Sequence, residues 1–251
     1  MPFGASRAGL MSTRVDAIPD SLVYHWVTPI SGLSDGETGF TWPADVGSPS
    51  ILAQNDLNYS TDSIDGQYDG VSGDGNDDYG DTESQLPNWS DNFISNDRAF
   101  VVEFVSNSFD DVATIFGVHN TSTGSVLTIR GRDTGNIQLR IRDDDDNEVV
   151  YETNAGAFDD GSRHVLILNK IGDDPTNWEW HEVADGSSTQ LSDNIVSTAS
   201  LTTFSTDLDF YTHARNDAGS PSNHQSIVVG AISLADASLD QSEREEAPFR
   251  I

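Results

Sequence analysis

The sequence predicts an all-β fold: a two-sheet antiparallel jelly-roll sandwich with one short helix near the C-terminus. Three observations predict it. Short segments that alternate apolar and polar residues recur along the chain, turns rich in glycine, asparagine and aspartate separate them, and no strand–helix–strand alternation appears. The chain has 251 residues, which is long enough for one large sandwich.

The predicted strands follow one another from residue 21 to residue 234. Ser21–Val27 is the first, and Ile51–Tyr59 has a weaker pattern. From residue 99 the alternation becomes regular. The strands expected there are Ala99–Ser106, Val112–Val118, Ser125–Arg132, Asn136–Arg142, Asn147–Glu152, Arg163–Lys170, Trp178–Val183, Asp207–His213 and Gln225–Leu234. Two of them, on either side of a turn at residues 133–135, form a predicted hairpin.

Two further segments carry predictions. Ser60–Glu83 is rich in aspartate and glycine, which predicts a solvated loop, with a cation-binding loop as the alternative. Near the end of the chain, Ser238 and Gln241 fit a capping box. Because Pro248 would stop a helix that starts there, we expect the helix at Leu239–Ala247.

The chain therefore divides into an N-terminal arm (1–20), a jelly-roll domain (21–236) and a C-terminal helix and tail (237–251). Met1–Thr13 contains no apolar run of signal-peptide length, and no segment approaches the ~18 apolar residues of a membrane span. We expect a soluble protein that is made in the host cytosol, without an export signal and without membrane insertion.

The charge of the chain is strongly acidic. Asp and Glu number 42 and Lys and Arg 12, giving a net charge of −30, and Lys170 is the only lysine. Such a charge disfavours a compact state in dilute buffer, but at about 1 M salt the Debye length falls to roughly 3 Å and the repulsion is screened. The composition resembles that of proteins from haloarchaea and their viruses. An ordinary acidic mesophilic protein and a calcium-dependent acidic protein are the alternatives. Nucleic acid is excluded as a partner, since the field repels phosphate.

Three motifs stand in order along the chain. They are Tyr68-Asp69-Gly70 followed by Asp77-Asp78-Tyr79, then Asp160-Gly161-Ser162-Arg163-His164-Val165, then Gly230–Ser233 followed by Leu239–Glu243. Together they resemble the laminin-G-like or pentraxin-like branch of the concanavalin A-like superfamily over about residues 21–247. The insert at residues 71–76 and Arg163, where tryptophan is common, depart from the family pattern. The resemblance implies two antiparallel sheets.

The resemblance also implies a calcium site at the rim of the sandwich. The ligands it suggests are Asp77 or Asp78, with Asn216 and Asp217 from a later loop, because loop oxygens suit this hard cation. The alternative is that these carboxylates hold only hydrated monovalent cations. Calcium is the only cofactor that we expect.

Four arginines run against the overall charge. Arg130, Arg132, Arg140 and Arg142 fall within two adjacent predicted strands, and alternation places all four away from the apolar face. One interpretation is local pairing with residues 143–146 and other acids. The other is a contact surface for an acidic neighbouring subunit or an anionic glycan, because guanidinium groups form paired bonds with carboxylates.

The sequence does not predict an enzyme. Retaining glycoside hydrolysis needs two carboxylates about 5–5.5 Å apart, and Glu179, Glu182 and Asp185 do not have a suitable spacing. The chain has no cysteine, which excludes disulfides and thiolate metal sites. The six histidines form no metal-binding pair of the His-x-His or His-Glu-x-x-His type.

These observations favour a structural or host-attachment protein of a halophilic virus particle, located in a capsid turret, a capsid decoration, a tail fibre or a baseplate. We expect a homo-oligomer, a trimer or pentamer, that contacts other virion proteins and host surface glycans. A cellular lectin-like module is the first alternative, with Trp42, Trp89 and Trp178 as candidate sugar-stacking residues, for each of which a place in the core is the other interpretation. A glycoside hydrolase is the second.

Overall fold

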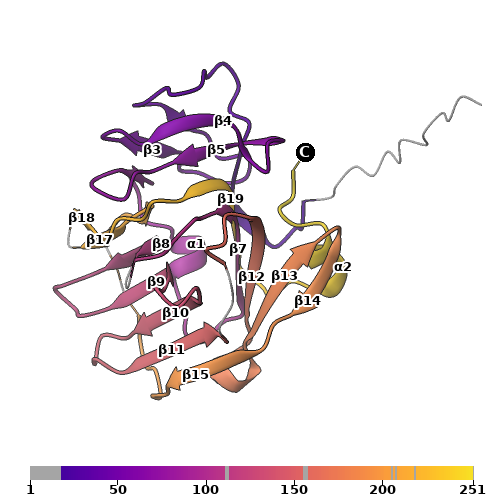
Figure 1. Cartoon of the computed structure of the whole chain (residues 1–251). Helices are drawn as coiled ribbons and strands as arrows, with labels where there is room; N and C mark the ends of the chain where they lie inside the picture. Colours follow the sequence, from indigo (N-terminus) through magenta and orange to yellow (C-terminus); the bar gives the residue numbers. More distant parts are fainter. Residues whose placement is uncertain are drawn as a thin grey trace, which may run out of the picture.

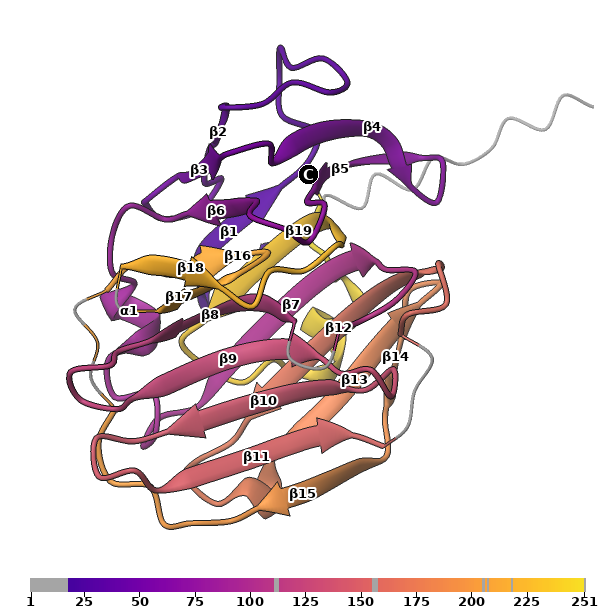
Figure 2. The same ribbon diagram turned by 60° about the vertical axis from the view of Figure 1, so that its left-hand side comes forward.

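A computed structural model describes residues 18–250, apart from residues 111–112, 155–157, 205, 207 and 218. Most of the predicted N-terminal arm, residues 1–17, lies outside the described part. The rest forms two β-sheets that face each other (Figures 1 and 2). The predicted all-β sandwich is therefore confirmed. None of the helices in the described part is long and apolar enough to span a membrane.

The first sheet has eight strands in the order β14-β13-β12-β7-β19-β5-β4, and β1 also pairs with β19. Its strands are β1 (Leu22–Val27), β4 (Asn58–Ile64), β5 (Tyr68–Ser72), β7 (Arg98–Val105), β12 (Arg163–Lys170), β13 (Glu179–Ala184), β14 (Ser187–Gln190) and β19 (Val228–Ala235). Because β1 and β5 both pair with β19, they lie one after the other along the same edge of that strand.

The second sheet has eleven strands, and its main order is β15-β11-β10-β9-β8-β16-β6-β3-β2. Its strands are β2 (Thr41–Trp42), β3 (Ile51–Gln54), β6 (Tyr79–Asp81), β8 (Thr114–His119), β9 (Val126–Gly131), β10 (Ile137–Arg142), β11 (Glu148–Thr153), β15 (Asp193–Ser197), β16 (Tyr211–Thr212), β17 (Arg215–Asp217) and β18 (Ser220–Ser222). Pairing is antiparallel except that β17 runs parallel to β8.

The core lies between the two sheets. Alternate residues of β7 and β10 are buried there, among them Phe100, Val102 and Leu139. The one-turn helix α1 (Pro87–Ser90) contributes Trp89, whose ring contacts Phe100 and three other phenylalanine rings. The candidate sugar-stacking residues Trp42, Trp89 and Trp178 are all buried, so that prediction is wrong.

A smaller apolar cluster covers part of the outer face of the first sheet. There Val101 and Ile167 pack against Leu239 and Phe249 of the C-terminal segment. That segment contains helix α2 (Gln241–Glu245), which lies beside β13 and β14 in Figure 1. The helix is shorter than predicted. Its capping box is formed by Asp240 and Glu243, two residues after the predicted positions 238 and 241.

Two other predictions of secondary structure need correction. The acidic segment 60–83 is not a solvated loop: it contains most of β4 and all of β5 and β6, because its backbone pairs with β19, β3 and β16. Conversely, of the described residues 208–213 in the predicted strand at 207–213, only Tyr211–Thr212 forms a strand, and residue 207 lies outside the described part. A 3-10 turn at Pro175–Asn177 precedes β13.

Candidate functional site

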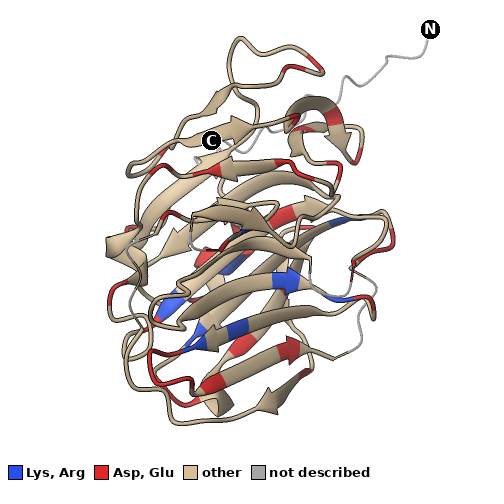
Figure 3. Cartoon of the chain, turned by 90° about the vertical axis from the view of Figure 1, so that its left-hand side faces the viewer, with Lys and Arg blue, Asp and Glu red and all other residues tan. Residues whose placement is uncertain are grey.

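The predicted arginines gather on the outer face of the second sheet. Leu127, Leu139 and their alternate neighbours on β9 and β10 point into the core, so the arginines between them point outward. Figure 3 looks onto this face and shows basic residues over its central strands, with acidic residues on a neighbouring strand and in the surrounding loops. We call this surface the arginine face. It comprises Arg130, Arg132, Arg140, Arg142 and, from β17, Arg215.

The register of the strands explains how these side chains meet. Arg130 of β9 stands opposite Gln138 of β10, which stands opposite Glu152 of β11. The guanidinium of Arg130 donates to the amide oxygen of Gln138 through Nε at 2.7 Å and also through Nη2, and Gln138 Nε2 donates to Glu152 Oε2 at 2.7 Å. One chain of hydrogen bonds thus crosses three strands and fixes the orientation of Arg130.

Two further arginines of the face are held by other partners. Arg140 bonds to Glu148 Oε2 through Nε at 2.7 Å and Nη2 at 2.5 Å. Arg142 donates from Nε to the carbonyl of Gly124 at 2.6 Å, and its Nη2 lies 3.0 Å from His119 Nε2. The same Nε lies 3.6 Å from a carboxylate oxygen of Asp146. Arg140 is thus paired with Glu148, and Arg142 lies near Asp146 of the acidic turn; both contacts are of the kind that the first interpretation, local pairing, expects.

The electrostatics of the face differ from those of the whole chain. Arg130 is only 9% exposed. Burial, and then the charges of Arg140 and Arg132, lower the pKa of Arg130 to about 10, so it remains charged at neutral pH. The charges of Arg140, Arg132 and Arg215 disfavour the charged form of Arg130, whereas that of Glu148 favours it, and Arg140 and Arg215 are themselves paired with Glu148 and Asp217. An anionic group bound beside Arg130 would further favour its charged form, so the face can accept such a group.

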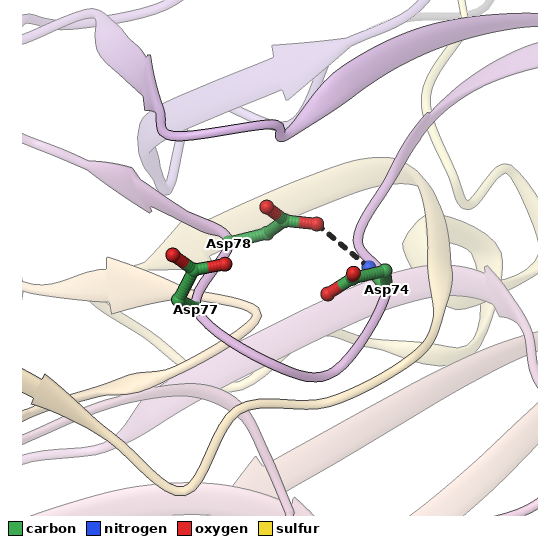
Figure 4. A group of neighbouring side chains, drawn as sticks. All are labelled: Asp74, Asp77 and Asp78. Carbon is green, nitrogen blue, oxygen red and sulfur yellow. Dashed lines mark hydrogen bonds between the residues drawn. The ribbon is translucent and has the colours of Figure 1, made fainter.

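A group of carboxylates lies between β5 and β6. Asp74, Asp77 and Asp78 offer oxygen atoms that all lie within 4.8 Å of one another (Figure 4). Asp78 is buried and accepts hydrogen bonds from the backbone N–H groups of Asp56 at 3.0 Å and Asp74 at 2.8 Å. Burial, and next the charge of Asp74, raise the pKa of Asp78. Much of this geometry serves the loop itself, because both oxygens of Asp78 hold backbone groups.

Of the predicted calcium ligands, Asp77 and Asp78 come together, whereas Asp217 lies elsewhere. Asp77 and Asp78 are joined by Asp74, which the sequence reasoning missed although it precedes them by three and four residues. Asp217 is not in this group: it lies on β17, 2.9 Å from Arg215 Nη2 and 2.8 Å from His119 Nδ1. The side chain of Asn216 lies outside the described part. The position of Asp217 depends on β17 running beside β8, which local sequence does not specify.

The carboxylates considered for hydrolysis are engaged elsewhere. Glu179 lies 2.9 Å from His181 Nε2, and Glu182 lies 2.8 Å from His164 Nδ1. Two other carboxylates are Asp81 on β6 and Asp209, which precedes β16. Burial raises the pKa of both groups, and the charge of Asp209 further raises the pKa of Asp81. This pair could not be predicted from local sequence, because it depends on the pairing of β6 with β16.

No protein-family model and no curated protein sequence matches the chain. Solved structures do. The structure of NanB with Optactamide is 18% identical, with a TM-score of 0.51 over 70% of this chain and 27% of that one. A Trypanosoma rangeli sialidase in complex with 2,3-difluorosialic acid is 11% identical, with a TM-score of 0.51 over 92% of this chain and 33% of that one.

A mutant of the NanB sialidase from Streptococcus pneumoniae is 18% identical, with a TM-score of 0.47 over 61% of this chain and 24% of that one. The likeness to the two structures with a TM-score of 0.51 is one of fold, and the chain spans between a quarter and a third of their length.

Proposed function

We propose that this chain is a glycan-recognition domain whose arginine face binds acidic sugars. The observation that carries the proposal is the gathering of five arginines on one sheet face of a chain with net charge −30. The same face holds Glu148, Glu152 and Asp217, which pair with Arg140, Gln138 and Arg215, so a ligand carboxylate would share guanidinium groups with carboxylates of the chain. Recognition of an anion by paired guanidinium bonds is compatible with such sharing, because each guanidinium has five N–H donors.

The geometry supports binding by a preorganised surface. Gln138 and Glu148 fix the guanidinium planes of Arg130 and Arg140 before any ligand arrives. Less conformational entropy is then lost when a ligand binds. Because a guanidinium has five N–H donors in a planar fork, it can hold its supporting residue and a ligand carboxylate together.

Sialic acid is the first ligand to test. Two solved structures that share the fold and have a TM-score of 0.51 are NanB and a sialidase, and the latter holds a difluorosialic acid. An acidic sugar of this kind offers both a carboxylate for arginine and hydroxyl groups for the polar rim of the face. Other carboxylated or sulfated sugars share this chemistry.

We propose binding rather than hydrolysis. Glu148 and Glu152 on this face orient Arg140 and Gln138, which is a supporting role. A glycoside hydrolase is the second candidate, and the observation that favours it is the raised pKa of both Asp81 and Asp209. A chain that releases free sugar from a sialoside, and loses that activity on Asp81→Asn, would support this second candidate.

We further propose that the domain works on the particle of a halophilic virus, as a structural or host-attachment protein that assembles into a homo-oligomer. The net charge of −30 supports a high-salt setting. A surface that binds acidic glycans would serve attachment to a host cell. Immunogold electron microscopy of a high-salt lysate tests this placement: label on particles is expected, whereas label confined to cell envelopes would contradict it.

The binding proposal is tested by calorimetric titration with the α-methyl glycoside of N-acetylneuraminic acid in high salt. We expect Arg140→Lys to weaken binding about tenfold, since it keeps the charge but loses the paired geometry. Arg244→Lys on α2, at the opposite sheet, is the matched control and should leave binding unchanged. Equal binding of methyl glucoside, or unchanged binding by Arg140→Lys, would contradict the proposal. A titration of the chain with calcium chloride, compared with the Asp78→Asn variant, tests the calcium prediction for Asp77, Asp78, Asn216 and Asp217, to which the structure adds Asp74.

A further inference from the structure

A second feature lies on the other side of the sandwich, at the outer face of the first sheet. The partner strand along one edge of β19 is split into β1 and β5, and Gly230 of β19 stands at the junction, where the register shifts. Directly after β1, the N–H of Thr28 donates to the carbonyl of Gly230 at 2.9 Å, and its hydroxyl donates to the carbonyl of Asp69 at 2.5 Å. The end of β1 is thus hydrogen-bonded to β19 and to β5, and a concave surface, here called the notch, lies between β1 and β5.

The notch holds a cavity of about 360 Å³, lined by Val27, Thr28, Pro29, Asp45, Tyr68 and Arg250. Tyr68 is 37% exposed, which makes it one of only two large hydrophobic side chains that are exposed in the described part of the chain. The volume falls within the range of about 300–1,000 Å³ that is typical of small-molecule sites. A single exposed aromatic side chain is ordinary on a protein surface, but one that lines a concave cavity beside charged donors and acceptors is typical of a ligand site.

The polar side chains around Tyr68 are held in place by a buried carboxylate. Glu103 of β7 is fully buried on the outer side of the sheet, and it pairs with Arg163 at 2.7 Å and with Arg250. Both guanidinium groups lie against the Tyr68 ring, with distances from the guanidinium carbon to the ring centroid of 5.3 Å for Arg163 and 4.6 Å for Arg250. A side chain on residue 230 would overlap the Glu103–Arg250 pair, so glycine there makes room for it.

Arg250 is also positioned through its own backbone. The carbonyl of Phe249 lies 3.2 Å from Nε2 of the buried His25, and Nη1 of Arg250 donates to the carbonyl of Thr28. On the other wall, the backbone N–H of Asp45 donates to the carbonyl of His25 at 2.8 Å. His25 therefore contacts the backbone of Asp45 and the backbone next to Arg250, the two charged residues that line the cavity. The ring of His25 is buried, and its Nδ1 lies 2.9 Å from the hydroxyl of Ser233, which fixes its orientation.

We infer that this cavity is a second binding site, for a neutral mono- or disaccharide. The two acids, Asp45 and Glu103, balance Arg163 and Arg250, so the site has no net charge that would select a multiply charged ligand. The exposed ring of Tyr68 offers an apolar surface for the face of a pyranose ring. Arg250 as a donor and Asp45 as an acceptor suit neighbouring sugar hydroxyls. The site lies on the other sheet from the arginine face and does not depend on it.

Saturation-transfer NMR in high salt tests the site, with the methyl glycosides of glucose, galactose, mannose and N-acetylglucosamine as neutral probes. We expect transfer to at least one probe, a loss of affinity of about tenfold or more in Tyr68→Ala, and retention in Tyr68→Phe, which keeps the ring. Asp45→Asn should weaken binding without removing the ring. Arg140→Lys should leave binding of the neutral probe unchanged, which separates this site from the arginine face.

Two outcomes would overturn the inference. One is the absence of transfer to all four probes at millimolar concentration. The other is transfer that Tyr68→Ala and Asp45→Asn leave unchanged, which would place the bound sugar elsewhere. Tyr68 is at the surface, so the variant should fold, and its thermal unfolding curve verifies this.

Discussion

Acid sensitivity of the fold can be predicted from one buried histidine. His213 follows β16 and is fully buried, with Nε2 3.0 Å from the carbonyl of Val71 and Nδ1 3.2 Å from the hydroxyl of Thr212. Burial lowers the pKa of His213 from 6.5 to about 4. In the pH window between these values the unfolded chain binds a proton at this residue and the folded chain does not. The free energy of unfolding therefore falls as pH falls from 6.5 to 4.

The size of the effect follows from the gap between the two pKa values, since one pKa unit corresponds to about 1.4 kcal/mol. Protonation of His213 should remove roughly 3 kcal/mol of stability by pH 4. The matched variant is His213→Asn, because the residue has a φ of 62° and asparagine tolerates this conformation. The variant loses the imidazole contacts but also the titrating group. His25 and His181, whose pKa values burial also lowers, remain in both proteins.

The assay is denaturant unfolding of both proteins in high salt at several pH values from 4 to 7. As pH falls from 7 to 4, the free energy of unfolding of the wild type should decrease by roughly 3 kcal/mol more than that of His213→Asn. The difference in free energy of unfolding between the two proteins should therefore narrow toward pH 4. Parallel curves for the two proteins would refute the reasoning, because they would show that His213 does not titrate differently in the folded and unfolded states.

Three other predictions follow from buried or charged features. Lys170 is fully buried and donates hydrogen bonds to the carbonyls of Ile94, Asn96 and Gly172. Lys170→Met leaves these carbonyls without their donor, so it should lower the free energy of unfolding, measured with denaturant, by about 3 kcal/mol or more. A decrease below about 1 kcal/mol would be inconsistent with these bonds. Gly230→Ala should cost about 1–3 kcal/mol by displacing the Glu103–Arg250 pair, and less in an Arg250→Ala background; equal costs in the two backgrounds would show that the overlap is not the cause. Because the net charge is −30, the free energy of unfolding should rise between about 0.1 M and about 1 M KCl, where the Debye length falls from about 10 Å to about 3 Å; denaturant unfolding that is independent of KCl would argue against adaptation to high salt.

The strands that sequence predicted well are those whose pattern is set by the core. The hairpin of β9 and β10 has apolar residues at every second position, and this alternation predicted the outward direction of Arg130 and Arg140. The acidic segment was misjudged because aspartate and glycine are poor strand formers. Its strands form through backbone pairing with distant partners such as β19, and local propensity carries no information about those partners.

The sites show the same division. The arginine face could be predicted because its main arginines come from two strands that are adjacent in sequence. The cavity beside Tyr68 could not be predicted, because its lining comes from the end of β1, the start of β5 and Arg250, which lie far apart in the chain. The burial of Lys170 was equally hidden, because the carbonyls that hold it belong to the segment before β7 and the turn after β12.

The most direct test of the central claim is a crystal structure of the chain soaked with the α-methyl glycoside of N-acetylneuraminic acid in high salt. The account predicts the ligand on the outer face of β9 and β10, with its carboxylate within hydrogen-bond distance of Arg130 or Arg140. A ligand bound elsewhere with this face unoccupied, or no bound ligand at a concentration that saturates the calorimetric titration, would contradict it.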